Sequence, residues 1–180
     1  MSSVIAIDYS MRCPCICVNT KNTFEFSDCV FHYLTDKKKS VFASNQFVGR
    51  LHKDYLSQEE RFNNISNWAL GIILQIENPI VFLEDYSYAS KGLTFSIGEN
   101  VGLLKYKLFL SKIPFVLVQP SKVKKSFCGK GNANKIKMYE EFIKKTNVDL
   151  LKFYSSIASP VNDIVDAFAL YQYGLLNINR

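Results

Sequence analysis

The chain has 180 residues, which is the size of one domain, so we expect residues 1–180 to form a single unit and not a multidomain machine. Hydrophobic residues make up 48% and charged residues 21%, a composition that excludes disorder over most of the chain. Polar residues interrupt every apolar run before it reaches about 18 residues, which excludes a membrane-spanning helix. The net charge of +6 is modest, but it is distributed unevenly.

Strand patterns dominate the start of the chain. Residues 4–7 form a short apolar run that ends in Asp8, residues 13–18 form a second run, and residues 23–33 alternate between apolar and polar side chains. A turn-like stretch joins the second run to the third, which predicts a meander of three antiparallel strands. Residues 34–55 carry no assignable pattern, so an insertion and a small extra hairpin both stay open.

Helical periodicity begins at Ser57, which with Glu60 fits a capping box. The helix that follows is predicted to end before Asn78. The later predicted elements are a buried strand at 79–84, a helix at 93–112, a strand at 115–118, basic helical pieces near 129–133, a helix at 134–145, and a helix from 159–160 to about 175.

This order of elements predicts an α/β fold. Three strands are followed by helix–strand–helix–strand and then by further helices. We therefore expect a mixed five-stranded sheet, with three antiparallel and then two parallel strands, flanked by helices on both faces.

Lysines concentrate in one segment of the chain. Residues 105–145 contain eleven lysines and two acids, a net charge of +9, so the remaining residues sum to −3. Such a segment favours a polyanionic partner, and nucleic acid before a membrane, because no basic amphipathic helix occurs at a terminus. The alternative is a lysine-biased composition of the kind an AT-rich genome produces. The triplet Lys37, Lys38 and Lys39 is interpreted as a solvated polar loop.

The N-terminus and the cysteines indicate a cytoplasmic protein. Residues 1–8 carry no basic leader, so we expect no signal peptide. The five cysteines are odd in number, which suits free thiols in a reducing compartment. Cys13, Cys15 and Cys17 alternate and would face one side of a strand, which is a poor tetrahedral zinc set, with Cys29 as the candidate fourth ligand. Small apolar core residues are the better interpretation.

Four acids lie at positions suited to binding a metal ion. Asp8 and Glu84 each end a buried strand, where a charge is costly unless it is paired or binds metal. Asp163 and Asp166 are three residues apart in the first turns of a helix and so project from one face. A turn residue at a strand end is the alternative interpretation of Asp8, and acids that complement the helix dipole are the alternative for Asp163 and Asp166. Together the four acids offer oxygen ligands for a hard cation, Mg²⁺ or Mn²⁺.

The motifs together resemble the RuvC-type Holliday-junction resolvases, and more narrowly the phage and viral members of that group, within the RNase H-like superfamily. The match extends from residue 4 to about residue 172. The motifs are IAIDYS at 5–10, VFLE at 81–84, GKGNANK at 129–135 and NDIVDAFA at 162–169.

The resemblance implies an RNase H-like fold with Asp8, Glu84, Asp163 and Asp166 as the catalytic, metal-binding acids, and Mg²⁺ as cofactor with Mn²⁺ as a substitute. It implies a homodimeric endodeoxyribonuclease, in the host cytoplasm if the source is a phage or virus, that binds four-way DNA junctions and nicks two strands symmetrically by two-metal-ion hydrolysis. The helix near residues 93–110 is the candidate dimer interface, with ordinary core packing of its apolar face as the equal alternative. A related nuclease for flaps, forks or RNA–DNA hybrids is an alternative, as is a non-catalytic nucleic-acid-binding relative, although no acid is missing.

Contacts with DNA are expected from lysines, which bind phosphates as point charges, and from the glycine-flanked loop at 129–133. That loop is not a P-loop, because no Ser or Thr follows its lysine; an ordinary capping loop is the alternative to a DNA-backbone loop. Bacterial relatives carry an aromatic residue where this chain has Ser87, so stacking on bases and core packing both stay open for the flanking tyrosines. The expected DNA-binding residues are Ser10, Tyr86, Tyr88, Lys122, Lys124, Lys125, Lys130, Asn132 and Lys135.

Overall fold

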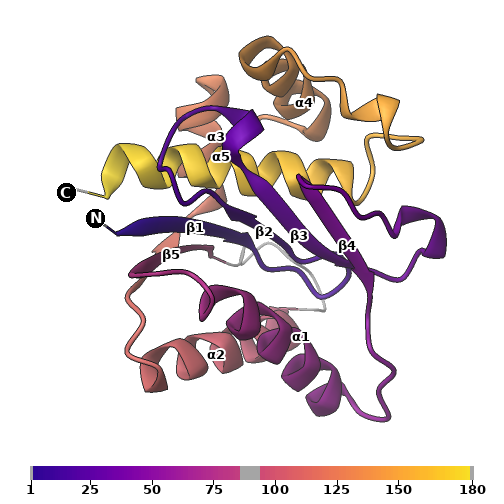
Figure 1. Cartoon of the computed structure of the whole chain (residues 1–180), viewed down its shortest axis with the longest axis vertical. Helices are drawn as coiled ribbons and strands as arrows, with labels where there is room; N and C mark the ends of the chain where they lie inside the picture. The colour runs from indigo at the N-terminus through magenta and orange to yellow at the C-terminus, as the bar shows by residue number, and fades with distance from the viewer. Residues whose placement is uncertain (1, 86–93, 179–180) are drawn as a thin grey trace.

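The computed structural model of the chain describes residues 2–85 and 94–178, and in these residues a single mixed sheet lies between two layers of helices (Figure 1). The strands are β1 (Ser3–Asp8), β2 (Cys15–Val18), β3 (Val30–Thr35), β4 (Phe47–Leu51), β5 (Pro79–Glu84) and β6 (Phe115–Val118). Their order across the sheet is β4-β3-β2-β1-β5-β6. β2 pairs antiparallel with β1 and with β3, whereas the pairs β1–β5, β5–β6 and β3–β4 are parallel.

The predicted α/β class and mixed sheet are confirmed, but the predicted number of five strands is wrong. The sixth strand, β4, comes from the unassigned residues 34–55 and extends the sheet at the edge beyond β3. Its five residues include Gly49 and exposed Arg50 and Leu51, so the strand is too short and too mixed in composition to show a clear alternation.

Helices cover the two faces unequally. The α-helices are α1 (Gln58–Ile73), α2 (Thr94–Leu110), α3 (Pro120–Cys128), α4 (Lys135–Thr146) and α5 (Val161–Asn177), and the 3₁₀ segments are η1 (Phe26–Asp28), η2 (Lys38–Ser40) and η3 (Leu150–Lys152). Figure 1 shows α1 and α2 on one face and α3, α4 and α5 on the other. Among the residues that the structure describes, no helix is long and apolar enough to cross a membrane.

Two hydrophobic cores follow from the alternation of β1. Val4 and Ala6 face the core on the α5 side, whereas Ile5 and Ile7 face the core on the α1 and α2 side. α5 lies very close to the sheet at Gly174, because a Cβ atom there would come within 2.8 Å of the Phe82 ring and 2.9 Å of Val4. This close approach packs the last turns of α5 directly against β1 and β5.

Side-chain caps fix the ends of two helices. The backbone amide of Glu60 donates to Ser57 Oγ at 3.2 Å, and the Glu60 carboxylate accepts from the amide of Leu56 at 2.7 Å, so the predicted capping pair is confirmed. Asn134 caps α4 by accepting from the amide of Lys137 at 2.9 Å. The predicted helical pieces near residues 129–133 are instead a loop, since α3 ends where Gly129 takes a positive φ of 75°.

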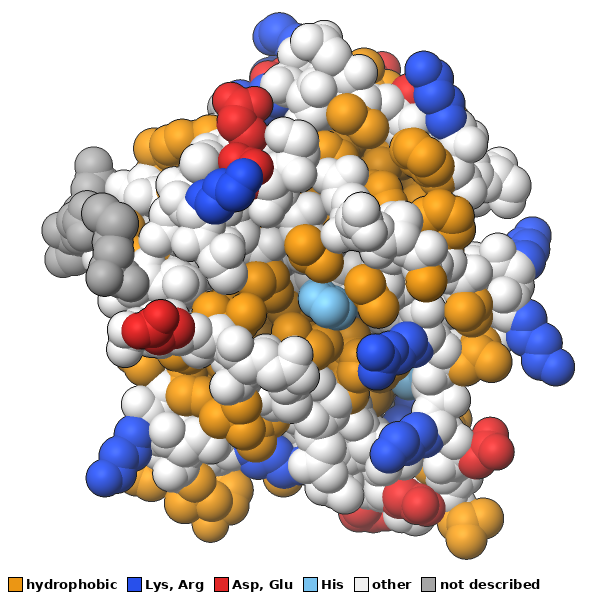
Figure 2. All heavy atoms as spheres, viewed as in Figure 1, with side chains coloured by type: hydrophobic (Ala, Val, Ile, Leu, Met, Phe, Trp, Pro, Cys, Tyr) orange, Lys and Arg blue, Asp and Glu red, His pale blue; other side chains and the backbone are white. Residues whose placement is uncertain are grey.

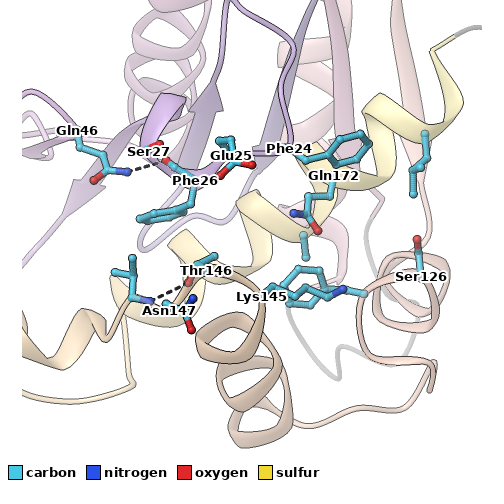
Figure 3. A pocket seen from close by; sticks show the side chains of 14 residues that line it. Phe24, Glu25, Phe26, Ser27, Gln46, Ser126, Lys145, Thr146, Asn147 and Gln172 are labelled. Atoms are coloured by element: carbon cyan, nitrogen blue, oxygen red, sulfur yellow. Dashed lines mark hydrogen bonds between the residues drawn. The ribbon is translucent and has the colours of Figure 1, made fainter.

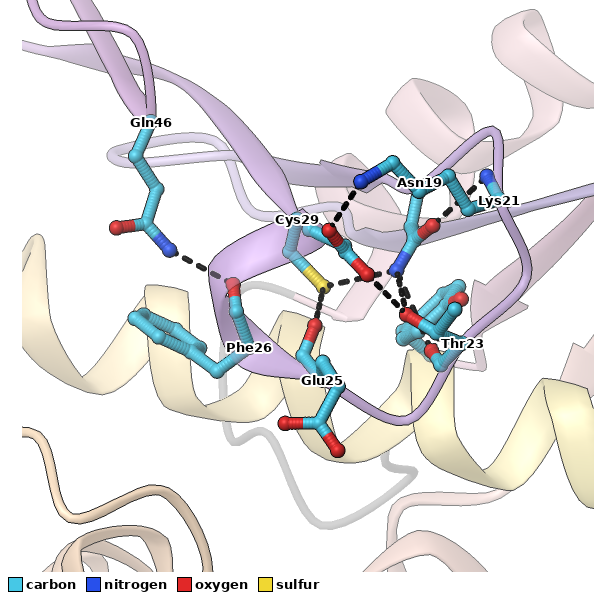
Figure 4. Close-up of polar contacts among 9 residues, drawn as sticks. Asn19, Lys21, Thr23, Glu25, Phe26, Cys29 and Gln46 are labelled. Carbon is cyan, nitrogen blue, oxygen red and sulfur yellow. Dashed lines mark hydrogen bonds and ion pairs between the residues drawn. The ribbon is translucent and has the colours of Figure 1, made fainter.

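The strand predicted at residues 23–33 is wrong in its first half, because residues 23–29 form a loop that contains η1 (Figure 4). Asn19 Nδ2 donates to the carbonyl of Thr23 at 3.3 Å, and Gln46 Nε2 donates to the carbonyl of Phe26 at 2.7 Å. Phe26 then inserts among the buried aromatic rings, with ring centroids 5.0 Å from Phe142 and 5.3 Å from Phe168. Tertiary contacts of this kind override the local alternation.

The connection from β3 to β4 is fixed by a buried tyrosine. The Tyr33 hydroxyl donates to the carbonyl of Ser40 at 2.7 Å and lies 3.0 Å from the Tyr154 hydroxyl. The ring of Tyr33 lies over Gly49, where a Cβ atom would overlap it. These contacts join η2, β4 and the segment that leads into α5.

Candidate active site

Asp8 and Glu84 lie side by side at one edge of the sheet. Ile7 pairs in parallel with Leu83, so the next residue of each strand falls at the same level. By the alternation of the strands, Asp8 shares a face with Ala6 and Glu84 shares a face with Phe82, both of which belong to the core on the α5 side. The two carboxylates therefore point toward α5.

α5 brings Asp163 and Asp166 to the same place in its first two turns. Asp163 is only 5% exposed, and its Oδ1 accepts from Asn162 Nδ2 at 3.2 Å. Its Oδ2 is buried and has no partner with hydrogen-bond geometry within the described residues. An anionic oxygen left in this state is costly unless a cation or a proton satisfies it.

The pKa shifts show that the charges of the four carboxylates influence one another. Burial, followed by the charges of Glu84, Asp163 and Asp166, raises the pKa of Asp8 well above its ordinary value. Burial and the neighbouring Asp166 raise the pKa of Glu84 to about 8, and burial and Asp163 raise the pKa of Asp166 to about 6. Burial also raises the pKa of Asp163, and the nearby Ser159 hydroxyl and Cys13 thiol oppose this rise. The four predicted acids thus form one cluster.

Two of the predicted DNA-binding lysines lie beside this acid cluster. The ammonium of Lys124, on α3, lowers the pKa of both Glu84 and Asp166, against the effect of burial. Lys135, at the first position of α4, lowers the pKa of Asp8, Asp163 and Asp166. These lysines therefore lie near enough to the acids to affect their ionisation.

The other expected DNA-binding residues are placed differently. Lys122, Lys125 and Lys130 are exposed, as is Asn132 in the loop between α3 and α4. Ser10 is half-buried, and its Oγ accepts from the amide of Cys13 at 3.0 Å. Tyr86, Tyr88 and Ser87 between them lie outside the described residues.

The donor chemistry of the acid cluster fits a hard cation, because all four side chains are carboxylates and one buried oxygen lacks a partner within the described residues. Within residues 2–85 and 94–178, however, no three His, Cys, Asp or Glu side chains are arranged so that they could hold a metal ion. The cluster thus offers ligands of the right kind without a completed coordination shell.

The cysteines belong to the core. Cys13, Cys15 and Cys17 do face one side, as the alternation predicts, and with Cys29 they are buried in the core on the α5 side. Burial, followed by the charge of Asp163 and a hydrogen bond with it, raises the pKa of the Cys13 thiol, so this thiol stays neutral beside the acid cluster.

One residue near the acids was missed by sequence reasoning. Lys37, interpreted above as belonging to a solvated loop, donates from Nζ to the carbonyl of Ser159 at 3.4 Å. Its charge also lowers the pKa of Cys13, although burial raises that pKa overall. No local signal connects residue 37 with the start of α5, because the contact depends on the unpredicted path of the chain between β3 and β4.

Two hollows in the described part of the chain lie away from the acids. A hollow of about 570 Å³ is bordered by the η1 loop, the end of α4 and the later turns of α5, where Lys145, Asn147 and Gln172 line it (Figure 3). A second hollow of about 380 Å³ lies between β3, β4 and α1 and is lined by His32 and Trp68. Figure 2 shows hydrophobic side chains around a histidine on the face between the sheet and α1.

Comparisons with known proteins agree with this architecture. No family model and no curated protein matches the sequence. Among solved structures, Thermus thermophilus RuvC is 17% identical with a TM-score of 0.60 and covers 96% of this chain and 94% of that one. T. thermophilus RuvC in complex with a Holliday junction substrate is 16% identical with a TM-score of 0.63 and covers 99% and 97%.

A third structure, the yeast mitochondrial Holliday junction resolvase Ydc2, is 12% identical with a TM-score of 0.50 and covers 97% of this chain and 82% of that one. The likeness in all three cases extends over nearly the whole chain. The resemblance expected from the motifs is therefore confirmed for the fold: the chain has the RNase H-like fold of the RuvC-type Holliday junction resolvases.

Proposed function

We propose that this protein is a metal-dependent endonuclease that resolves four-way DNA junctions by paired, symmetric nicks. The observation that carries the proposal is the gathering of Asp8, Glu84, Asp163 and Asp166 at one edge of the sheet, from three elements far apart in sequence. The whole-length likeness to resolvases, one of them bound to a Holliday junction, supports the choice of substrate.

The acids would hold Mg²⁺, for which Mn²⁺ can substitute. Bound divalent ions would supply an activated water and stabilise the departing 3′ oxygen of the phosphodiester. Asp8, on the central strand and influenced by the three other acids, would be a ligand at the centre of the metal site. Lys124 and Lys135 offset some of the negative charge, which favours the approach of an anionic strand to this carboxylate-rich edge.

The homodimer expected from the resemblance belongs to the proposal, with α2 as its interface. A stripe along this helix exposes large apolar side chains: Phe95 is 87% exposed, Tyr106 58%, Phe109 71% and Leu110 59%. Exposed apolar side chains gathered on one helix are typical of an interaction surface. A second copy would cover this stripe and place two acid clusters about a two-fold axis, as symmetric incisions require.

Cleavage assays test the proposal directly. A labelled four-way junction, a flap, a fork and an RNA–DNA hybrid are incubated with the protein in Mg²⁺ and in EDTA. We expect the junction to be cut best, with two symmetric nicks, and only with the metal. Preferential cleavage of the flap, fork or hybrid would instead assign one of the related nuclease activities.

The Asp8→Asn variant should lose cleavage while it keeps junction affinity within severalfold, because a metal ligand is removed and the lysines are untouched. Glu84→Gln, Asp163→Asn and Asp166→Asn should behave in the same way. Asp85→Asn is the matched control, since its side chain leaves the chain on the opposite side to that of Glu84. Activity of Asp8→Asn near that of the unmodified protein would remove Asp8 from the site.

A further inference from the structure

We propose that a hollow between the β3–β4 connection and the segment before α5 binds a backbone phosphate of the substrate strand, next to the phosphate that is cleaved. The proposal rests on the proposed nuclease function and adds a second anion site to it. Figure 1 shows the β3–β4 connection and the start of α5 at the same side of the molecule.

The hollow has the composition of a phosphate site. Its volume is about 290 Å³, and its lining includes two lysines and several hydroxyls but no acidic residue among those the structure describes. Ammonium groups and hydroxyls are the donors that phosphate oxygens accept from. The side chains that matter here are those of Lys37, Lys39, Ser155, Ser156 and Ser159.

The hollow shares a wall with the acid cluster. Lys37 Nζ donates to the carbonyl of Ser159 at 3.4 Å, and Ser159 Oγ donates to Asn162 Oδ1 at 3.5 Å. Ser159 also borders Asp163, whose pKa its hydroxyl lowers against the effect of burial. A strand whose scissile phosphate lies at the acids therefore passes the hollow with a neighbouring phosphate.

Both walls of the hollow are connected to β3 by buried contacts. The buried Tyr33 hydroxyl connects the carbonyl of Ser40 with the Tyr154 hydroxyl, so both sides of the hollow are fixed to β3. Phe42, on the β3–β4 connection, packs against Phe153, on the segment before α5, with 6.3 Å between ring centroids. A preformed site of this kind loses little entropy when it binds.

The charge of the two lysines is uncompensated by carboxylates among the described residues. The ion pairs found there use Lys21, Lys144 and Lys145, and neither Lys37 nor Lys39 takes part in one. Lys38, between them, lines a different hollow together with Asp36 and Asp54. Lys38 is therefore a matched control, with the same charge one residue away and facing acids.

The experiment compares Lys37→Ala, Lys39→Ala and Lys38→Ala, all at exposed positions, with folding verified by thermal melts. Junction binding is measured in EDTA by fluorescence anisotropy over a salt series. Loss of a phosphate contact flattens the slope of log K against log salt by about 0.9. We expect this flattening, or a fraction of it, for Lys37→Ala and Lys39→Ala, and an unchanged slope for Lys38→Ala.

A second arm identifies the phosphate. Single uncharged methylphosphonates are placed in turn around the cleavage position of the junction. At one position the methylphosphonate should weaken binding by the unmodified protein but not by Lys37→Ala. The two changes remove the same contact, so their effects on the binding free energy are not additive. If no position shows this non-additivity, Lys37 acts only as diffuse charge and the proposed site is wrong.

The outcome separates the two proposals. If the protein cuts junctions but all three lysine variants bind alike, the phosphate site is wrong and the nuclease function stands. If the unmodified protein neither binds nor cuts any nucleic acid, both are wrong.

Discussion

Lys124 lies close enough to Glu84 for its ammonium to counteract the rise in pKa that burial gives this carboxyl. Lys124 is half-buried on α3, whereas Lys122 and Lys125 on the same helix are exposed. One helix thus carries a lysine directed at the acids and two lysines directed at solvent.

The lysines should therefore separate into two classes. Lys122→Ala and Lys125→Ala should each flatten the salt dependence of junction binding by up to about 0.9 and recover their cleavage rate at saturating protein. Lys124→Ala and Lys135→Ala should keep a reduced single-turnover rate even at saturation, because they alter the charge around the acids. Full recovery by Lys124→Ala would show that this lysine contributes only to binding.

The metal-free protein should lose stability as the pH rises. The native Glu84 carboxyl, with a pKa of about 8, keeps its proton where an unfolded carboxyl near 4.5 has lost it. The native state then binds more protons, so the free energy of unfolding falls between these values, by at most about 1.4 kcal/mol per pH unit for each such group. Asp166, with a pKa of about 6, adds to the fall at the lower end of this range.

Thermal melts in EDTA from pH 5 to pH 8 measure this loss, and Glu84→Gln should make it smaller. Addition of Mg²⁺ should restore more stability at pH 8 than at pH 5, since a cation binds ionised carboxylates. The prediction would be contradicted if the melting temperature in EDTA rose between pH 6 and pH 8, and rose by more in the unmodified protein than in Glu84→Gln.

Introducing a charge on α2 should break the proposed dimer. Phe109→Glu places a carboxylate in the exposed apolar stripe, which a partner helix cannot bury without a large penalty. Leu74→Glu, at a residue just after α1 that is 60% exposed, is the control. Sedimentation should give twice the 20.6 kDa chain mass for the control and the single mass for Phe109→Glu. If the unmodified protein is monomeric both alone and when bound to DNA, the dimer is excluded.

Two glycines should respond in opposite directions to an added methyl group. Gly49→Ala places a Cβ against the Tyr33 ring and should destabilise the protein by about 1–3 kcal/mol. Gly71→Ala, at an exposed position of α1 with open space around it, should stabilise by about 0.5–1 kcal/mol. Urea unfolding measures both changes. A neutral Gly49→Ala would mean that β4 moves freely away from β3.

The elements that determine the site were predictable because their signals are local. Short apolar runs ending in Asp8 and Glu84 define strands, and the spacing of Asp163 and Asp166 defines one helix face. The path of residues 34–55 was not predictable, since β4 depends on pairing with β3 and on Tyr33 lying over Gly49. Contacts between segments distant in sequence leave no periodic pattern in either of them.

The place of α5 in the chain has a consequence for synthesis. The helix supplies two of the four acids and covers the central strands at Val4 and Phe82, yet it follows every described strand of the sheet in sequence. A nascent chain on the ribosome that already contains all of these strands has an incomplete acid cluster, and one apolar face of its sheet is exposed to water. The proposed nuclease activity would therefore arise only after α5 has left the ribosome and docked.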